Sequence, residues 1–279
     1  MAHPQIAVFA RLADGQAERI RAIEGQRTLL GRTMHGIAYD SVNDEIIVPQ
    51  QFGQSLLVFP GNATGETPPK RVIQGSKTEL IAVDRVAVDP VNDEIYAPDG
   101  AMVLVYPRAA SGNVAPKRVL RGPNTRIGDA HSVAIDAKRN LLIVASARPT
   151  SAEVLEVRDS ARRQNEITIF ERTADGDVKP TRVITGVGAG GNIVVDAERG
   201  LIFAAQSDHV AVWSVEDEGE APPRFTIGGP SGVLRAVRGV TLDPKNKTVI
   251  VTDKYLNAVL TFHVPAIYDT PATGAARPR

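Results

Sequence analysis

Apolar and polar positions alternate along most of this chain in short runs that recur at regular intervals. One recurring unit is an alternating run, a tight turn and a second alternating run, and its copies begin at Gly36, Arg85, Ser132, Asn192 and Gly239. Alternation with period two places every second side chain on one face, which is typical of β-strands. An aspartate ends the first run of each copy, at Asp40, Asp89, Asp136, Asp196 and Asp243. These aspartates are separated by 49, 47, 60 and 47 residues, which indicates a structural repeat.

A second unit follows the first and supplies the other half of the repeat. It contains a run ending in an aromatic residue, a glycine turn, a proline and a basic run, as in LLVFPGNATGETPPKRVIQG from Leu56 and VLVYPRAASGNVAPKRVLRG from Val103. Branched and aromatic residues favour strands, and the glycine, asparagine and aspartate between them favour turns. Each half therefore predicts a β-hairpin, and two hairpins make one four-stranded propeller blade. A solenoid is the alternative, but solenoid repeats often carry helices and no helical period occurs here.

The expected fold is an all-β propeller of five blades, each with four antiparallel strands, because the first unit occurs five times. Residues 20–24 are expected to complete the last blade, so that the N-terminal strand closes the ring. This arrangement leaves one strand over, either 6–10 or 259–263. A six-bladed ring with one incomplete blade is therefore the alternative. We expect a single domain over residues 1–268 and a disordered tail over 269–279.

Composition narrows the classes of partner and compartment. Lys+Arg and Asp+Glu both number 32, so there is no global field to attract nucleic acid. The chain has no cysteine, which excludes disulfides and thiolate metal sites. No apolar run approaches the ~20 residues that span a bilayer, so no membrane partner is expected. The first residues lack a signal-peptide core. We expect a monomer that is either cytoplasmic or the mature part of an exported protein.

The strand-plus-aspartate units GIAYD, RVAVD and SVAID, with the A-x-G…P-x-R-x-I-x-G units, resemble NHL-type and related bacterial propeller repeats. The resemblance covers about residues 6–264. It implies a propeller, and propellers of this kind include lyases, lactone and ester hydrolases, and protein- or RNA-binding modules. The fold does not decide among these functions. The sequence contains no H-E-x-x-H, G-x-S-x-G, Walker or EF-hand motif.

The candidate site is the channel mouth, where the residues entering the first strand and leaving the second strand of each blade share one face. These residues vary between repeats, whereas the neighbouring core positions repeat. The candidates are His35, Asp84, Arg85, Asp99, His131, Asn192, Gln206, Arg238 and Asp253. His35, His131 and Asp84 could ligate a divalent metal such as zinc, as channel histidines do in the lyases that the resemblance suggests. A solvated polar lining and acid–base catalysis without metal are the alternatives.

The 60-residue spacing places an insertion over about residues 146–166 on the same face. Long loops are binding loops, lids or mobile insertions, and a short helix over 152–163 fits the pattern. With no catalytic motif, we expect a propeller that binds a small molecule or a protein at the channel mouth. The alternative function is a channel-centred, metal-dependent hydrolase or lyase of lactonase or esterase type.

Overall fold

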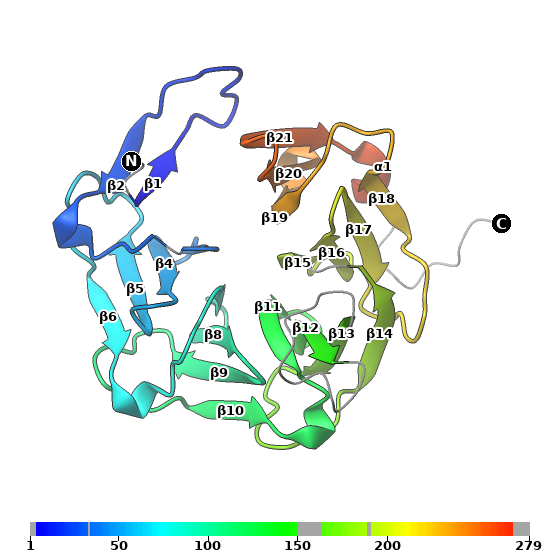
Figure 1. Cartoon of the computed structure of the whole chain (residues 1–279), viewed down its shortest axis with the longest axis horizontal. Helices are drawn as coiled ribbons and strands as arrows, with labels where there is room; N and C mark the ends of the chain where they lie inside the picture. The colour runs from blue at the N-terminus through cyan, green and yellow to red at the C-terminus, as the bar shows by residue number, and fades with distance from the viewer. Residues whose placement is uncertain (1–3, 33, 150–162, 189–190, 270–279) are drawn as a thin grey trace. The chain divides into compact units, whose positions relative to one another are not determined.

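The computed structural model describes residues 4–32, 34–149, 163–188 and 191–269. The fold is all-β, with five blades whose strands pair antiparallel in chain order (Figure 1). The first two blades contain β3 (Ala38–Asp40), β4 (Glu45–Gln50), β5 (Ser55–Pro60), β6 (Arg71–Gln74), β7 (Ala87–Asp89), β8 (Glu94–Asp99), β9 (Met102–Pro107) and β10 (Arg118–Arg121).

The last three blades follow the same order. Their strands are β11 (Asp129–Asp136), β12 (Leu141–Pro149), β13 (Arg163–Glu171), β14 (Arg182–Val187), β15 (Ile193–Asp196), β16 (Leu201–Ala205), β17 (His209–Ser214), β18 (Phe225–Gly228), β19 (Val237–Asp243), β20 (Thr248–Asp253) and β21 (Ala258–His263). Among the described residues, the helical elements are the short α1 (Pro265–Tyr268) and the 3₁₀ turns Gln26–Thr28, Ser76–Thr78, Pro123–Thr125 and Pro244–Asn246. No helix among the described residues is both long enough and apolar enough to span a bilayer.

Four blades have the four strands that the repeat predicts, and the fifth sheet has three, β19-β20-β21. Residues 20–24 were expected to supply its fourth strand. Instead, β2 (Arg21–Glu24) pairs with β1 (Gln5–Val8) in a separate two-stranded hairpin. These pairings do not confirm closure by the N-terminal strand. The physical reason is local: β1 has the same alternating pattern as the other third strands, and it is the nearest partner along the chain for β2.

The aspartates that mark the repeat fix the turn between the first and second strands. Asp40 Oδ1 accepts hydrogen bonds from the amides of Val42 (2.9 Å) and Asn43 (3.0 Å), and its Oδ2 accepts from Asn43 Nδ2 (2.8 Å). Asp89 makes the same three contacts in the second blade. A short acidic side chain that caps its own turn holds a hairpin at a fixed register. The repeated aspartates are therefore structural.

Neighbouring blades are joined at their outer edge by a second repeated device. The outer strand of one blade forms a parallel bridge to a glycine in the next blade, in the pairs Ile23–Gly65, Ile73–Gly112, Leu120–Gly176 and Ile184–Gly219. These glycines have φ between 56° and 75°. A side chain is disfavoured in that left-handed conformation, which explains why glycine recurs in the A-x-G unit.

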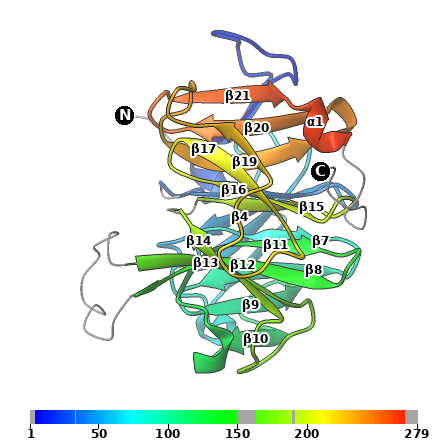
Figure 2. The same cartoon turned by 90° about the vertical axis from the view of Figure 1, so that its right-hand side faces the viewer.

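The chain divides into two compact units, Met1–Asp99 with Leu104–Lys117, and Gly100–Val103 with Arg118–Arg279. In the second unit β11, β15 and β19 lie side by side (Figure 1). Apolar clusters fill the spaces between successive sheets. β12 and β13 are longer than their counterparts and extend past the neighbouring strands (Figure 2). The predicted insertion thus begins and ends as a paired hairpin, while residues 150–162, with the suggested helix, lie outside the described residues. So do residues 270–279 of the predicted tail.

Candidate functional site

Three predicted site residues come together in the first unit. His35 precedes β3 and Asp84 precedes β7, and Nδ1 of His35 contacts Oδ1 of Asp84. Arg85 Nη1 lies 3.4 Å from Asp84 Oδ2, and the Arg85 side chain packs over Gly36. His35 and Asp84 therefore lie in contact, each just before the first strand of its blade.

In the second unit, His131 and Arg238 occupy equivalent backbone irregularities. Each is the extra residue of a β-bulge in the first strand of its blade, His131 in β11 and Arg238 in β19. A bulge re-aims a side chain and is enriched next to functional sites. His131 Nδ1 lies 3.4 Å from the carbonyl of Asp129. Among the described residues, no group of three or more His, Cys, Asp or Glu could hold a metal ion.

The side chain of Asn192 links two adjacent blades. Its Oδ1 accepts a hydrogen bond from the amide of Val240 in the next blade (3.0 Å), and its Nδ2 donates to the carbonyl of Ile193 (3.2 Å). One blade earlier, Ser132 Oγ accepts from the amide of Ile193 (3.0 Å) in the same way. Some of the polar residues at these entrances therefore accept hydrogen bonds that join the first strands of adjacent blades.

The residues that end the second strands divide into two kinds. Asp99 accepts from the amides of Ile81 (2.6 Å) and Ala82 (2.9 Å). Asp253 accepts from four amides, including Arg235 (2.7 Å). Burial alone would raise the pKa of Asp253, but these amide donors outweigh it and the pKa is lowered. Both carboxylates are therefore occupied in holding loops.

Gln206 stands at the same register and behaves differently. Its counterpart Gln50 uses Oε1 to accept a hydrogen bond from the amide of Gly31 (2.6 Å). Gln206 is 3% exposed, and neither Oε1 nor Nε2 has a hydrogen-bond partner among the described residues. A buried polar group without a partner is uncommon in native proteins and requires an explanation.

Gln206 lines a pocket of about 580 Å³ formed by segments of the last two blades, including Gly191 before β15. Ser207 follows β16, Arg235 and Arg238 lie at the entrance to β19, and Lys254 and Tyr255 follow β20. Gln206 and Arg238 were predicted from the repeat. Sequence reasoning missed Ser207, Arg235, Lys254 and Tyr255, although Lys254 directly follows Asp253 and Arg235 lies three residues before Arg238.

The pocket is electrostatically positive. Three of its lining residues are basic and none is acidic. Arg235 Nη1 donates to the carbonyls of Gly232 (2.6 Å) and Leu234 (2.9 Å), which holds its guanidinium in place. Arg238 and Lys254 are exposed and form no ion pair with a described residue.

The nearest carboxylates are already engaged. His209 Nδ1 lies 2.7 Å from Asp208 Oδ1, and this hydrogen bond lowers the pKa of Asp208. Asp253 is buried and faces the loop amides. The arrangement therefore offers two exposed cations, an anchored guanidinium and a buried amide on one concave surface. Its volume falls within the ~300–1,000 Å³ of small-molecule sites.

No protein-family model matches the sequence, and no curated protein matches it. Among solved structures, the WD40 β-propeller domain of Doa1 is similar with a TM-score of 0.50 and 12% identity, covering 83% of this chain and 69% of that one. A chain of the mitotic checkpoint complex is similar with a TM-score of 0.58 and 12% identity, covering 88% of this chain. This protein spans only 65% of that chain's length. The NHL-type resemblance is not confirmed, whereas the β-propeller fold is shown.

Proposed function

We propose that this protein is a binding propeller and that a small anionic ligand binds in the pocket around Gln206. The observation that carries the proposal is the buried Gln206 amide, which has no partner among the described residues and belongs to a residue that lines a basic pocket. Leaving such a group unpaired costs about 1–3 kcal/mol. A ligand that supplies its hydrogen bonds recovers that cost on binding.

The basic residues define the chemical class of the ligand. A guanidinium presents a planar fork of donors that matches the geometry of a carboxylate or a phosphate. The bulge sets the direction in which Arg238 leaves the backbone, and two carbonyls hold the guanidinium of Arg235, so Arg235 needs little further ordering when the ligand arrives. Preorganised donors increase affinity because less conformational entropy is lost.

The remaining walls of the pocket suggest an organic anion. Ala236, Val237 and the ring of Tyr255 contribute apolar surface beside the charges. Gln206 offers both a donor and an acceptor, so a carboxylate alone would leave its carbonyl oxygen without a donor. The preferred ligand therefore carries an acidic group together with a hydroxyl, amide or amine.

The experiment is a binding screen of hydroxy and amino carboxylates, their neutral amides and inorganic phosphate. Differential scanning fluorimetry would find binders, and calorimetry would measure them. Arg238→Gln and Lys254→Gln should each weaken binding at least tenfold. Lys245→Gln is the matched control, because Lys245 is exposed in the same unit and does not line the pocket. Equal weakening by the control, or binding only by the neutral amides, would refute the proposal.

A further inference from the structure

Main-chain hydrogen bonds join the segments that form the pocket around Gln206. The amide of Val237 donates to the carbonyl of Ser207 (2.9 Å), and the amide of Lys254 donates to the carbonyl of Ala236 (2.8 Å). All of these residues belong to the second unit. The pocket is therefore built within one unit, and its main chain needs little ordering when a ligand binds.

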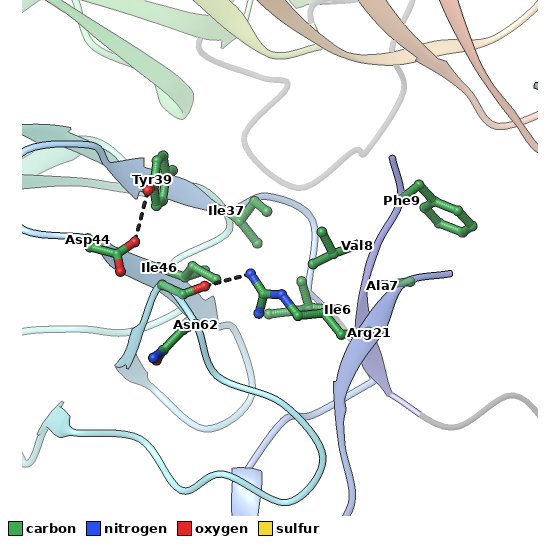
Figure 3. Close-up of a pocket in the computed structure, with 11 residues that line it drawn as sticks. Ile6, Ala7, Val8, Phe9, Arg21, Ile37, Tyr39, Asp44, Ile46 and Asn62 are labelled. Atoms are coloured by element: carbon green, nitrogen blue, oxygen red, sulfur yellow. Dashed lines mark hydrogen bonds between the residues drawn. The ribbon is translucent and has the colours of Figure 1, made fainter. Parts of the chain in front are cut away.

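A pocket of similar volume in the first unit shows which feature of this site is unusual. It measures about 600 Å³, and its tyrosine, its acid and its arginine are all engaged within the protein (Figure 3). Tyr39 donates to Oδ1 of Asp44 (2.9 Å), and Arg21 Nη2 donates to the carbonyl of Gly61 (2.6 Å). Around Gln206, by contrast, the buried amide and two of the three cations have no such partner among the described residues. Polar groups that await a partner, and not volume, distinguish a ligand site.

The buried amide of Gln206 requires two kinds of hydrogen-bonding group from a ligand. Its Nε2 donates and its Oε1 accepts, and neither atom has a partner among the described residues. A carboxylate or a phosphate only accepts, so it can satisfy Nε2 but not Oε1. A hydroxyl both donates and accepts, and two hydroxyls on adjacent carbons can serve both atoms at once. Ser207 also lines the pocket and suits a further ligand hydroxyl. A ligand with several hydroxyls therefore matches this part of the pocket.

The cations of the pocket favour an acid group and disfavour an amine on the same ligand. Arg235, Arg238 and Lys254 line the pocket, and no acidic residue among the described residues does. Like charges repel at short range, so a protonated amine is the least favourable of the groups that could bond to Gln206. A carboxylate or a phosphate is attracted, and each arginine can hold it with paired N–H donors.

An exposed aromatic residue also lines the pocket. Tyr255 is 77% exposed, and its main chain is fixed because its amide donates to Oδ1 of the buried Asp253 (2.9 Å). The face of an aromatic ring is flat and apolar, so it packs on a flat group of C–H bonds. In a cyclic sugar the hydroxyls lie around the rim and C–H bonds lie on a face. One sugar ring can therefore contact Tyr255 and Gln206 together, whereas a linear amide acid has no such face.

We propose that the ligand of this pocket is an acidic sugar. The inference rests on the proposed function, because it names the chemical class of the anion that binds around Gln206. Two adjacent hydroxyls bond to the Gln206 amide, the acid group pairs with the basic side chains, and a C–H face of the sugar packs on Tyr255. A sugar acid and a sugar phosphate share this chemistry, and the binding experiment separates them.

The experiment measures binding to the full chain by calorimetry, with probes that each lack one feature. Glucuronate represents the sugar acid and glucose 6-phosphate the sugar phosphate, and at least one of them should bind. Glucose lacks the acid group, tetrahydropyran-2-carboxylate and inorganic phosphate lack the sugar hydroxyls, and succinamate carries an amide in place of the sugar ring. Each of these probes should bind at least about tenfold more weakly, because each leaves polar groups of the pocket unpaired.

The outcomes separate this inference from the proposed function. If tetrahydropyran-2-carboxylate, succinamate or inorganic phosphate binds as tightly as the acidic sugars, the pocket is an anion site and the acidic sugar is wrong. If glucose binds as tightly as they do, the role of the cations is wrong in both proposals. If none of the acids binds, the proposed function fails and this inference fails with it.

Variants of Tyr255 test the contact with the sugar face. Tyr255→Ala should weaken binding of the acidic sugar at least about tenfold, whereas Tyr255→Phe should bind it normally because the aromatic ring remains. The melting temperature should stay the same in both variants, because an exposed ring contributes little packing. Leu256→Ala is the control, since Leu256 is exposed in the same turn and does not line the pocket. Normal sugar binding by Tyr255→Ala, or an equal loss in Leu256→Ala, would overturn the assignment.

Discussion

The sharpest prediction compares the same substitution at two equivalent glutamines. Methionine has nearly the length and volume of glutamine but forms no strong hydrogen bond, so it removes the amide and largely preserves the packing. Gln206→Met replaces a buried amide that has no partner among the described residues. Gln50→Met removes the acceptor that holds the amide of Gly31 at 2.6 Å. The two changes should therefore affect stability in opposite directions.

The magnitudes follow from the cost of unpaired polar groups. Removing the unsatisfied Gln206 amide should raise the free energy of unfolding by about 1 kcal/mol, and removing the Gln50 contact should lower it by about 1 kcal/mol. For a chain of this size, 1 kcal/mol shifts the melting temperature by roughly 2–4 °C. Gln206→Met should also abolish binding of the anionic ligand. Gain of stability with loss of function is the signature of a residue kept for binding.

Urea unfolding followed by tryptophan fluorescence is a suitable assay, because the only tryptophan, Trp213, is buried in the blade that contains Gln206. Binding would be measured by calorimetry on the same samples. The reasoning fails if both variants lose stability equally, because Gln206 would then have a structural partner as important as that of Gln50. It also fails if Gln206→Met binds the ligand as well as the unmodified protein does.

Three further predictions concern the scaffold and the metal hypothesis. Arg71 donates two hydrogen bonds to the buried Glu45 and lowers the pKa of that carboxyl from 4.5 to about 2. The stabilisation is therefore present above pH 4.5 and is lost as the pH falls from 4.5 to 2. Acid unfolding curves of Glu45→Gln should lack this component, and identical curves would contradict it. Val133→Asp should cost more than ~4 kcal/mol, because it buries an unpaired carboxylate in the core. A melting temperature within a few degrees of the unmodified protein's would contradict this. If a divalent metal binds through His35 and His131, elemental analysis of the purified protein should find it, and the double alanine variant should lose it. Metal-free protein that takes up no added zinc would end that hypothesis.

The sequence by itself determined the repeat and therefore the strands. Alternation and turn chemistry are local properties, so the hairpins after Gly36 and Arg85 and the turns at Asp40 and Asp89 could be read directly from the residues. The aspartate spacing also located the start of the extended hairpin β12–β13. The expectation of five blades followed from the five copies of the first repeated unit.

Tertiary structure decided how the strands near the two ends of the chain pair. The segments 6–10 and 259–263 have the same strand pattern, and pattern alone cannot determine which neighbour a strand selects. Pairing depends on which edges are available in space. The structure pairs β1 with β2 and leaves three strands in the last sheet.

Tertiary structure also decided which of the predicted residues are available to a ligand. Asp99, Gln206 and Asp253 occupy one register of the repeat and were indistinguishable from the sequence. Loop amides occupy the two carboxylates, whereas the Gln206 amide has no partner among the described residues. The basic residues around it, Arg235, Arg238 and Lys254, follow Gln206 in the chain by 29 to 48 residues. Their convergence depends on how adjacent blades pack, because a site is a property of distances in space that local residue patterns do not encode.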